Sequence, residues 1–287
     1  MSSSKILSAS ELFGVEGVVA VVTGGGTGIG LMMAAALENN GATVYIVGRR
    51  VDVLEKAARE NNRNGKIIPV QCDITSRDSV LALASTIRER EGYIDLLVNN
   101  AGIVVPTHKP GSHTGDIKEL QAQLWASGTA ENWGKTFDVN VTAVFNMTVA
   151  FLDLLAAGNA RRAAGEPTSQ VITVASIAGF RRDDNLFSLS YPASKSAVTH
   201  LAKSFTAIFK DFKIRSNVIA PGLYPSEMTE NLLSDDMVKQ GVPLGRAGSA
   251  NDAAGIILFL ASKAGSYVDG TVHLTDGGRL SLFPSTY

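Results

Sequence analysis

Tyr191 and Lys195 stand four positions apart in the segment YPASK, with Pro192 directly after the tyrosine. Residues four apart on a helix share one face, with Cβ atoms about 5–6 Å from each other. An ammonium so placed lowers the pKa of a phenol from its ordinary value of about 10. The pair is therefore suited to proton transfer, and Pro192 is typical of a helix's first turn. Because the spacing also arises by chance on surface helices, other motifs must support this interpretation.

A glycine-rich turn near the N-terminus has the residue types that bind phosphate. The segment VVTGGGTGIG joins an apolar run to the helical pattern LMMAAALENNG. Gly24, Gly28 and Gly30 allow a tight turn and a close backbone approach, and the helix N-terminus behind them favours an anion. The turn follows the first expected strand, which is where a dinucleotide pyrophosphate binds in open α/β sheets. Its spacing, Gly-x-x-x-Gly-x-Gly, differs from the usual G-x-G-x-x-G.

Short apolar runs alternate with helical patterns, which predicts an α/β fold, a doubly wound Rossmann-type parallel sheet flanked by helices. Seven strands are expected, at 18–23, 43–48, 67–72, 94–100, 170–176, 215–222 and 271–278. Pro69 lies in the third strand, which is an edge in the 3-2-1-4-5-6 order, and an edge tolerates proline. No linker or repeat divides the chain, so we expect a polar N-terminal arm (1–16) and one domain (17–287).

The composition excludes several classes of function. The chain has 287 residues, of which 45% are hydrophobic and 18% charged, and its net charge of −1 comes without a basic block, so no nucleic-acid partner is expected. No apolar run reaches the roughly 20 residues that span a membrane. A single cysteine, Cys72, and the absence of a signal-like leader predict a reduced, cytoplasmic location. These features favour a small-molecule substrate.

Four motifs occur in order: the glycine turn, NNAG at 99–102, Ser176 after the fifth strand, and Tyr191-x-x-x-Lys195. Together they resemble the short-chain dehydrogenase/reductase family over nearly the whole chain. The resemblance implies that the protein interconverts a ketone and a secondary alcohol with a nicotinamide dinucleotide. It assigns Tyr191 as proton donor or acceptor and Lys195 as the group that lowers its pKa and holds the nicotinamide ribose. It assigns Ser176 to the substrate oxygen and Asn140 to a water in the proton relay.

The chemistry of these residue types agrees with that assignment. Hydride transfer to a carbonyl builds negative charge on its oxygen, which a hydroxyl donor such as Ser176 stabilises. A neighbouring acid must then deliver a proton. Tyr191 suits this task because Lys195 and the oxidised nicotinamide are both cationic and lower its pKa.

The same resemblance assigns residues to the dinucleotide. Asp73 in QCDIT matches the position whose carboxylate accepts from the adenine amino group, although it is also a candidate helix cap. Ser226 stands where members often have threonine, and it keeps the hydroxyl. The expected cofactor contacts are Gly24, Thr27, Gly28, Ile29, Gly30, Arg49, Asp73, Ile74, Asn100, Ala101, Gly102, Tyr191, Lys195, Pro221, Gly222, Tyr224 and Ser226.

The choice between NAD and NADP depends on the end of the second strand. In this fold an acid about 20 residues beyond the glycine turn accepts from the ribose 2′-OH of NAD, whereas an arginine there takes the 2′-phosphate of NADP. Gly48 fills the usual acid position and Arg49 follows it. NADP(H) is therefore expected rather than NAD(H). The alternative is that Arg49 and Arg50 are solvated or paired with Asp52 or Glu55.

The segment 104–134 is longer than this family usually has, and we expect it to act as a substrate-side lid. His108 and His113 lie in its Gly/Pro-rich part and make a poor ligand set, so no metal is expected. Basic residues in 157–170 are interpreted as a solvated face. Helical spacing behind an expected capping box predicts an extra helix from Asp116, Ile117, Glu119, Leu120, Leu124 and Trp125.

The fold leaves other functions open. Reduction of an activated C=C bond and a nucleotide-binding regulatory role are the alternatives, and the intact set of Asn140, Ser176, Tyr191 and Lys195 argues against the second. A wide apolar stripe follows Tyr191 and predicts a homodimer or homotetramer. Its residues are Ala197, Val198, Leu201, Phe205, Ile208 and Phe209.

Overall fold

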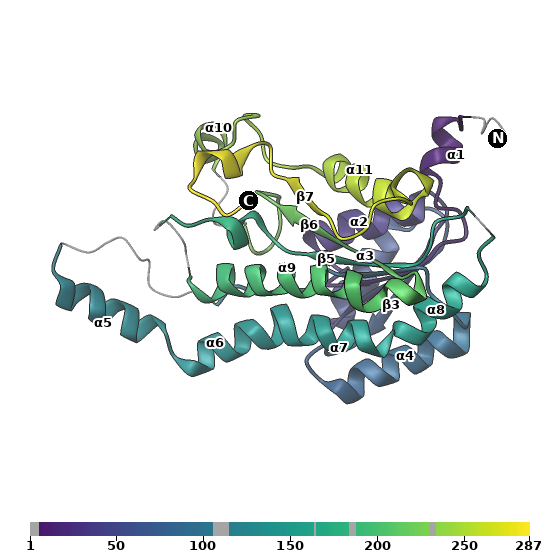
Figure 1. Cartoon of the computed structure of the whole chain (residues 1–287), viewed down its shortest axis with the longest axis horizontal. Coiled ribbons are helices and arrows are strands. Elements are labelled where there is room, and N and C mark those ends of the chain that lie inside the picture. Colours follow the sequence, from purple (N-terminus) through teal and green to yellow (C-terminus); the bar gives the residue numbers. More distant parts are fainter. Residues whose placement is uncertain (1–5, 106–114, 164, 184–187, 230–233) are drawn as a thin grey trace.

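The computed structural model describes residues 6–105, 115–163, 165–183, 188–229 and 234–287. Its sheet has seven parallel strands in the order β3-β2-β1-β4-β5-β6-β7 (Figure 1), which confirms the predicted fold class. Pro69 lies in the edge strand β3 opposite Ile46, as expected from its missing N–H. The strands are β1 Val19–Thr23, β2 Thr43–Gly48, β3 Ile67–Gln71, β4 Leu96–Asn99, β5 Gln170–Val174, β6 Arg215–Pro221 and β7 Val272–Thr275.

Helices cover both faces of the sheet (Figure 1), and alternate residues of each strand face opposite layers. In β1, Ala20 and Val22 pack with α2, α3 and α11, whereas Val19 and Val21 pack with α4, α7, α8 and α9. The helices of these layers are α2 Gly28–Asn39, α3 Val51–Asn61, α4 Arg77–Glu91, α7 Ala143–Ala150, α8 Leu152–Ala160, α9 Ser190–Phe209 and α11 Ala250–Ala261.

Residues 1–16 are not simply a polar arm. Within their described part, Ala9–Phe13 form the short helix α1, and Ser8 and Glu11 make a reciprocal capping box at its start. Val15 is buried in the core. The hydrophobic contact at Val15 therefore ties the end of this segment to the body of the protein.

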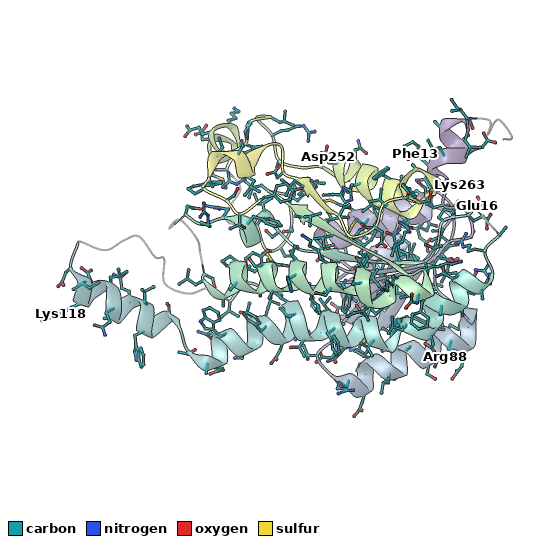
Figure 2. The ribbon with its side chains drawn as sticks, viewed as in Figure 1. Phe13, Glu16, Arg88, Lys118, Asp252 and Lys263 are labelled. Carbon is teal, nitrogen blue, oxygen red and sulfur yellow. The ribbon has the colours of Figure 1, made fainter. Side chains whose placement is uncertain are left out.

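The extra helix expected in the long segment is present as α5 Ile117–Ser127, followed by α6 Ala130–Phe137. The Asp116 carboxylate caps α5 by accepting from the Lys118 N–H, which differs from the expected contact with Glu119. Figure 1 shows α5 extending away from the sheet, and Figure 2 places Lys118 at its outer end. His108 and His113 lie outside the described residues.

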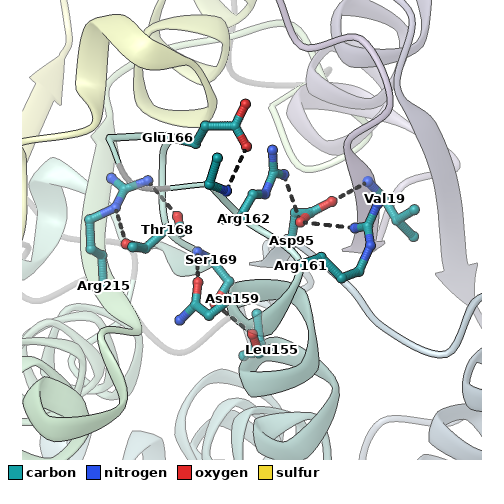
Figure 3. A network of polar contacts seen from close by, with 11 residues as sticks. Val19, Asp95, Leu155, Asn159, Arg161, Arg162, Glu166, Thr168, Ser169 and Arg215 are labelled. Carbon is teal, nitrogen blue, oxygen red and sulfur yellow. Dashed lines mark hydrogen bonds and ion pairs between the residues drawn. The ribbon is translucent and has the colours of Figure 1, made fainter.

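A buried carboxylate organises the end of the sheet opposite the strands' carboxyl ends (Figure 3). Asp95 is 5% exposed, accepts from the Val19 N–H at 3.0 Å and pairs with the Arg162 guanidinium at 2.7 Å. Arg161 lies 3.3 Å from the centre of the Tyr93 ring. The interpretation of 157–170 as a solvated face is therefore wrong for Arg162, because a buried carboxylate requires a paired cation, whereas Arg161 remains exposed.

Within the described ranges, no single helix is long and apolar enough to cross a membrane. One helix pair bent by 45°, Ala130–Ala150 with Leu152–Ala160, passes that test by length and composition only. Phe151 at the bend is fully buried in the core.

Candidate active site

The carboxyl ends of the strands surround a cavity of about 580 Å³. Nearly all residues expected at the site line it, including Ser176, Tyr191 and Lys195. The lining residues that had been assigned to the dinucleotide come from the ends of β1, β2, β3, β4 and β6, the turns after them, and the first two turns of α9. They are Gly24, Thr27, Gly28, Ile29, Arg49, Asp73, Ile74, Asn100, Ala101, Gly102, Tyr191, Lys195, Pro221, Gly222, Tyr224 and Ser226.

The glycine turn leaves room and donors for an anion. Thr27 is the N-cap of α2 but makes no side-chain capping bond, so the first N–H groups of the helix are not capped by that side chain. Gly28 has φ of +51°, and a Cβ there would lie 2.9 Å from the Ser226 Cβ. A side chain at Gly28 would therefore fill the gap between the turn and the loop after β6. This geometry fits a pyrophosphate.

Gly30 has a different place from the one expected. It does not appear in the cavity wall, and a Cβ there would lie 2.3 Å from the Gly24 oxygen and 2.4 Å from Asn100 Nδ2. Gly30 therefore lets α2 pack directly against its own turn.

Thr23, which the sequence interpretation missed, joins the glycine turn to the NNAG segment. Its Oγ1 accepts from the N–H groups of Asn100 at 3.0 Å and Ala101 at 3.1 Å. Asn100 Nδ2 donates to the Thr23 oxygen at 3.0 Å and the Gly24 oxygen at 3.3 Å. The first and fourth strand ends are thus held together beneath the cavity.

Tyr191 and Lys195 lie in the first two turns of α9, and Pro192 is in its first turn as predicted. Lys195 Nζ donates to the Val174 oxygen at 2.9 Å and lies 5.8 Å from the centre of the Tyr191 ring. Ser176 follows β5 and caps the start of the 3-10 turn Ile177–Phe180, where its Oγ accepts from the Ala178 N–H at 3.1 Å. Three elements therefore bring the hydroxyl, the phenol and the ammonium into one wall.

Burial dominates the electrostatics of these groups. It raises the pKa of the Tyr191 phenol, while a hydrogen bond with Ser176 acts in the opposite direction. It lowers the pKa of Lys195 to about 8. The expected lowering of the phenol pKa is therefore not seen in the protein alone, because loss of solvation outweighs it. A neutral phenol is the form that can donate a proton.

Asn140 is buried behind the cavity rather than in its lining. It lies in a π-helical turn, Asp138–Thr142, between α6 and α7. Its Oδ1 accepts from the Ile103 N–H at 2.9 Å, and its Nδ2 donates to the Ile103 oxygen and to Ser194 Oγ, each at 3.0 Å. Asn140 thus anchors the chain just after NNAG to the start of α9, and its expected role with a water stays a prediction.

Arg49 and Asp73 face each other across the strand ends of β2 and β3. Hydrogen bonds from Thr75 lower the pKa of Asp73, and the nearby Arg49 guanidinium adds to that effect. Helix α4 is capped by Ser76, so Asp73 is not its cap. Both side chains line the cavity.

Arg50 has a different partner from those considered in the sequence. Its guanidinium pairs with Glu227 at 2.7 Å, across the mouth of the cavity. Sequence reasoning could not have found this pair because the two residues are 177 positions apart. Arg49, the neighbouring arginine, takes no part in this ion pair.

The loop after β6 is fixed by its own hydroxyls. Thr229 Oγ1 lies 3.0 Å from Ser226 Oγ and donates to the Tyr224 oxygen at 2.6 Å. The Tyr224 ring is buried, and a Cβ at Gly248 would lie 2.4 Å from it. Tyr224 thus anchors the loop by its ring, and Thr229 and Met228 are lining residues that the sequence interpretation missed.

Within the described ranges, no group of three or more His, Cys, Asp or Glu side chains is placed to hold a metal ion. Cys72 lines the cavity, is buried, and accepts from Ser79 Oγ at 3.4 Å.

Comparison with known proteins decides the family. Residues 18–237 match the family model described as short chain dehydrogenase. The chain belongs to the short-chain dehydrogenase/reductase family. This dehydrogenase/reductase is 46% identical to the short-chain dehydrogenase/reductase PhomF of Diaporthe leptostromiformis, over 100% of both chains. It is an oxidoreductase of a family that uses NAD(P) and acts on CH–OH and C=O groups.

Two solved structures share its architecture. The Pseudomonas aeruginosa RhlG/NADP active-site complex has a TM-score of 0.81 at 29% identity, covering 94% of the dehydrogenase/reductase and 99% of that chain. A 7 alpha-hydroxysteroid dehydrogenase complexed with NADH and 7-oxo glycochenodeoxycholic acid has a TM-score of 0.80 at 25% identity, covering 95% and 98%. One neighbour thus holds NADP and the other NADH.

Proposed function

We propose that the protein is an NADP(H)-dependent oxidoreductase that interconverts a ketone and a secondary alcohol. The observation that carries the proposal is the convergence of Ser176, Tyr191 and Lys195 on the cavity that also contains the glycine turn. The hydroxyl, the phenol and the ammonium supply the three groups that carbonyl reduction requires. A solved relative with a 7-oxo steroid bound supports a carbonyl as the reacting group.

The residues that would hold the cofactor are the glycine turn, Arg49, Asp73, NNAG and the loop after β6. When bound there, a reduced nicotinamide dinucleotide supplies a hydride to the carbonyl carbon. Ser176 stabilises the oxygen that becomes negative by donating its O–H, and the Ala178 N–H, which donates to Oγ, holds that hydroxyl in place. Tyr191 then delivers the phenolic proton to that oxygen.

Lys195 places a positive charge near Tyr191 during this step. Lys195 as a whole is 4% exposed, and water therefore screens its ammonium little. A phenolate formed at Tyr191 would gain a nearby cation, which favours proton release from the phenol at the moment it is needed. Through its hydrogen bonds, Asn140 holds Ile103 and Ser194 in place beside Tyr191 and Lys195.

The proposed reduction of a ketone is tested by incubating the purified protein and NADPH with a panel of ketones, quinones and enones. Loss of the reduced-cofactor absorbance with ketones supports the proposal. Turnover of enones alone would instead favour reduction of an activated C=C bond, and turnover of no compound would leave the proposal without support.

NADP preference rests on the missing acid at Gly48 and on Arg49 beside it. A charge-assisted contact to a phosphate contributes about 1.5–3 kcal/mol. Replacing Arg49 with alanine should weaken NADPH binding at least about tenfold and leave NADH binding nearly unchanged. Titration of both cofactors by fluorescence measures this. Gly48→Asp with Arg49→Ser should reverse the preference.

Arg50→Ala is the matched control for Arg49→Ala, because Glu227 holds the Arg50 guanidinium at 2.7 Å. It should change NADPH affinity no more than about threefold, as expected for an exposed ion pair. Equal losses for both cofactors in Arg49→Ala, or a larger loss in Arg50→Ala, would remove Arg49 from the phosphate site.

We also propose a homodimer or homotetramer. Part of the stripe on α9 is used internally, since Val198, Phe205 and Phe209 are buried. Ile208 remains 60% exposed, and Phe145 on α7 is 47% exposed. Family members commonly pair through these two helices. Sedimentation should show at least twice the 30.2 kDa of one chain, and Phe145→Asp should shift the mass toward 30.2 kDa. A wild-type protein at 30.2 kDa throughout the micromolar range would refute the proposal.

The reduced, cytoplasmic location stays a prediction from composition. It is tested by the cellular distribution of the tagged protein.

A further inference from the structure

The C-terminal segment pairs with the chain just after the catalytic serine. The Arg182 N–H donates to the Pro284 oxygen at 2.8 Å, and the Thr286 N–H donates to the Phe180 oxygen at 2.9 Å. These bonds form an antiparallel bridge between Arg181 and Ser285. Residues 283–287, here called the tail, follow the 3-10 turn Arg279–Leu282 beyond β7. The tail thus pairs with a segment that lies about one hundred residues earlier in the sequence.

Side chains reinforce the pairing on both sides. The Arg181 guanidinium lies 3.7 Å from the centre of the Phe283 ring, and the rings of Phe180 and Tyr287 meet edge to face at 5.2 Å. The Tyr287 hydroxyl donates to the Val272 oxygen of β7 at 3.1 Å. Cation–π, aromatic and hydrogen-bonding contacts therefore act together.

The paired segment leads directly to the catalytic groups. The 3-10 turn Ile177–Phe180 begins at Ser176, whose Oγ caps it through the Ala178 N–H. A Cβ at Gly179 would lie 2.8 Å from the Lys195 carbonyl carbon, so this turn rests on α9 beside the ammonium-bearing residue. Any displacement of Phe180 would therefore be transmitted to Ser176 and to the start of α9.

A second arginine links the tail region to α10. The Arg279 guanidinium donates to the Gly241 oxygen at the end of α10, Asp235–Gly241, and lies 5.3 Å from the Phe283 ring centre. Phe283 is thus close to both Arg181 and Arg279. The Phe283 ring and Arg279 together connect the loop after β5 to α10.

We propose that the tail is a positioning element of the active site, holding Phe180–Arg182 so that Ser176 and the start of α9 keep their geometry. Removal of the tail should alter substrate use and leave the dinucleotide site intact, because the cavity residues assigned to the dinucleotide do not include it. The tail also lies outside the core: Tyr287 is 63% exposed, and the hydrophobic core clusters contain no tail residue.

The first test uses a chain ending at Leu282 and measures backbone hydrogen exchange. The Arg182 amide should exchange at least about tenfold faster than in the full chain because it loses its acceptor, the Pro284 oxygen, and amides of the turn 177–180 should exchange faster because the turn loses its support. Amides of β1 and α2 should be unchanged. Unchanged exchange in 177–183 would overturn the proposal, and this result does not depend on any enzymatic activity.

The second test is kinetic and rests on the proposed reductase function. Phe283→Ala should raise KM for a ketone about five- to tenfold, with NADPH affinity within about twofold of wild type. Phe283→Tyr keeps the ring and should restore KM. Phe13→Ala serves as the matched control, because Phe13 is a half-exposed phenylalanine on α1 near the other terminus (Figure 2).

A merely structural role would weaken cofactor and substrate binding together, and that result would contradict the proposal. If the wild-type protein reduces no ketone, the proposed function fails, while the exchange measurement still decides the role of the tail.

Discussion

Replacing Tyr191 with phenylalanine is expected to lower ketone reduction by about 10³-fold, because a positioned general acid contributes 10²–10⁴-fold. The ring and its packing are kept, and only the transferable proton is lost. NADPH affinity should therefore stay within about threefold of wild type. Steady-state rates and a fluorescence titration of the same preparation separate the two effects.

Tyr93→Phe is the control for this substitution. It removes the same hydroxyl at a distant site, where the ring lies beneath the Arg161 guanidinium. Its activity should match wild type. Activity of Tyr191→Phe within about tenfold of wild type on a ketone that wild type reduces would contradict the role of the phenol.

Lys195→Met is expected to reduce both the rate and the affinity for NADPH. Methionine fills much of the volume but removes the ammonium, so the Tyr191 phenolate loses its cation and the nicotinamide ribose loses a donor. We expect a combined loss in kcat/KM of at least about 10²-fold. An effect on rate alone would leave the ribose contact unsupported.

The pH profile gives Lys195 a signature of its own. Burial lowers the pKa of Lys195 to about 8, so the ammonium is present below that pH and is lost as the pH rises through it. The wild-type kcat/KM for reduction should therefore decline above pH about 8, because this parameter reports groups of the free enzyme. Lys195→Met should lack that decline. A profile that is the same in both proteins would assign the titration to another group.

The sequence predicted the sheet and most of the cavity because their signals are local or ordered along the chain. Pro69 marked the edge strand through its missing N–H, and the spacing of Tyr191 and Lys195 placed them on one helix. Asp73, Arg49 and Ser226 follow strand ends, which parallel pairing brings to one edge.

What the sequence could not predict depends on tertiary distance or on solvation. The Arg50–Glu227 pair and the bridge between Arg181 and Ser285 join residues from distant parts of the chain. The π-helical turn at Asn140 carries no spacing signal. The pKa of Tyr191 is raised by burial, and the degree of burial cannot be predicted from the residue types alone.

The central claim is that the cavity directs reduction to a carbonyl carbon, and isotope transfer tests it most directly. The wild-type protein is given NADPH deuterated at the transferable position together with a ketone that it turns over. We expect one deuterium on the carbinol carbon of the alcohol product of the wild-type protein. With Tyr191→Phe we expect no deuterium above background in the same time. Deuterium on any carbon other than the carbinol carbon, or equal labelling by Tyr191→Phe, would contradict this claim.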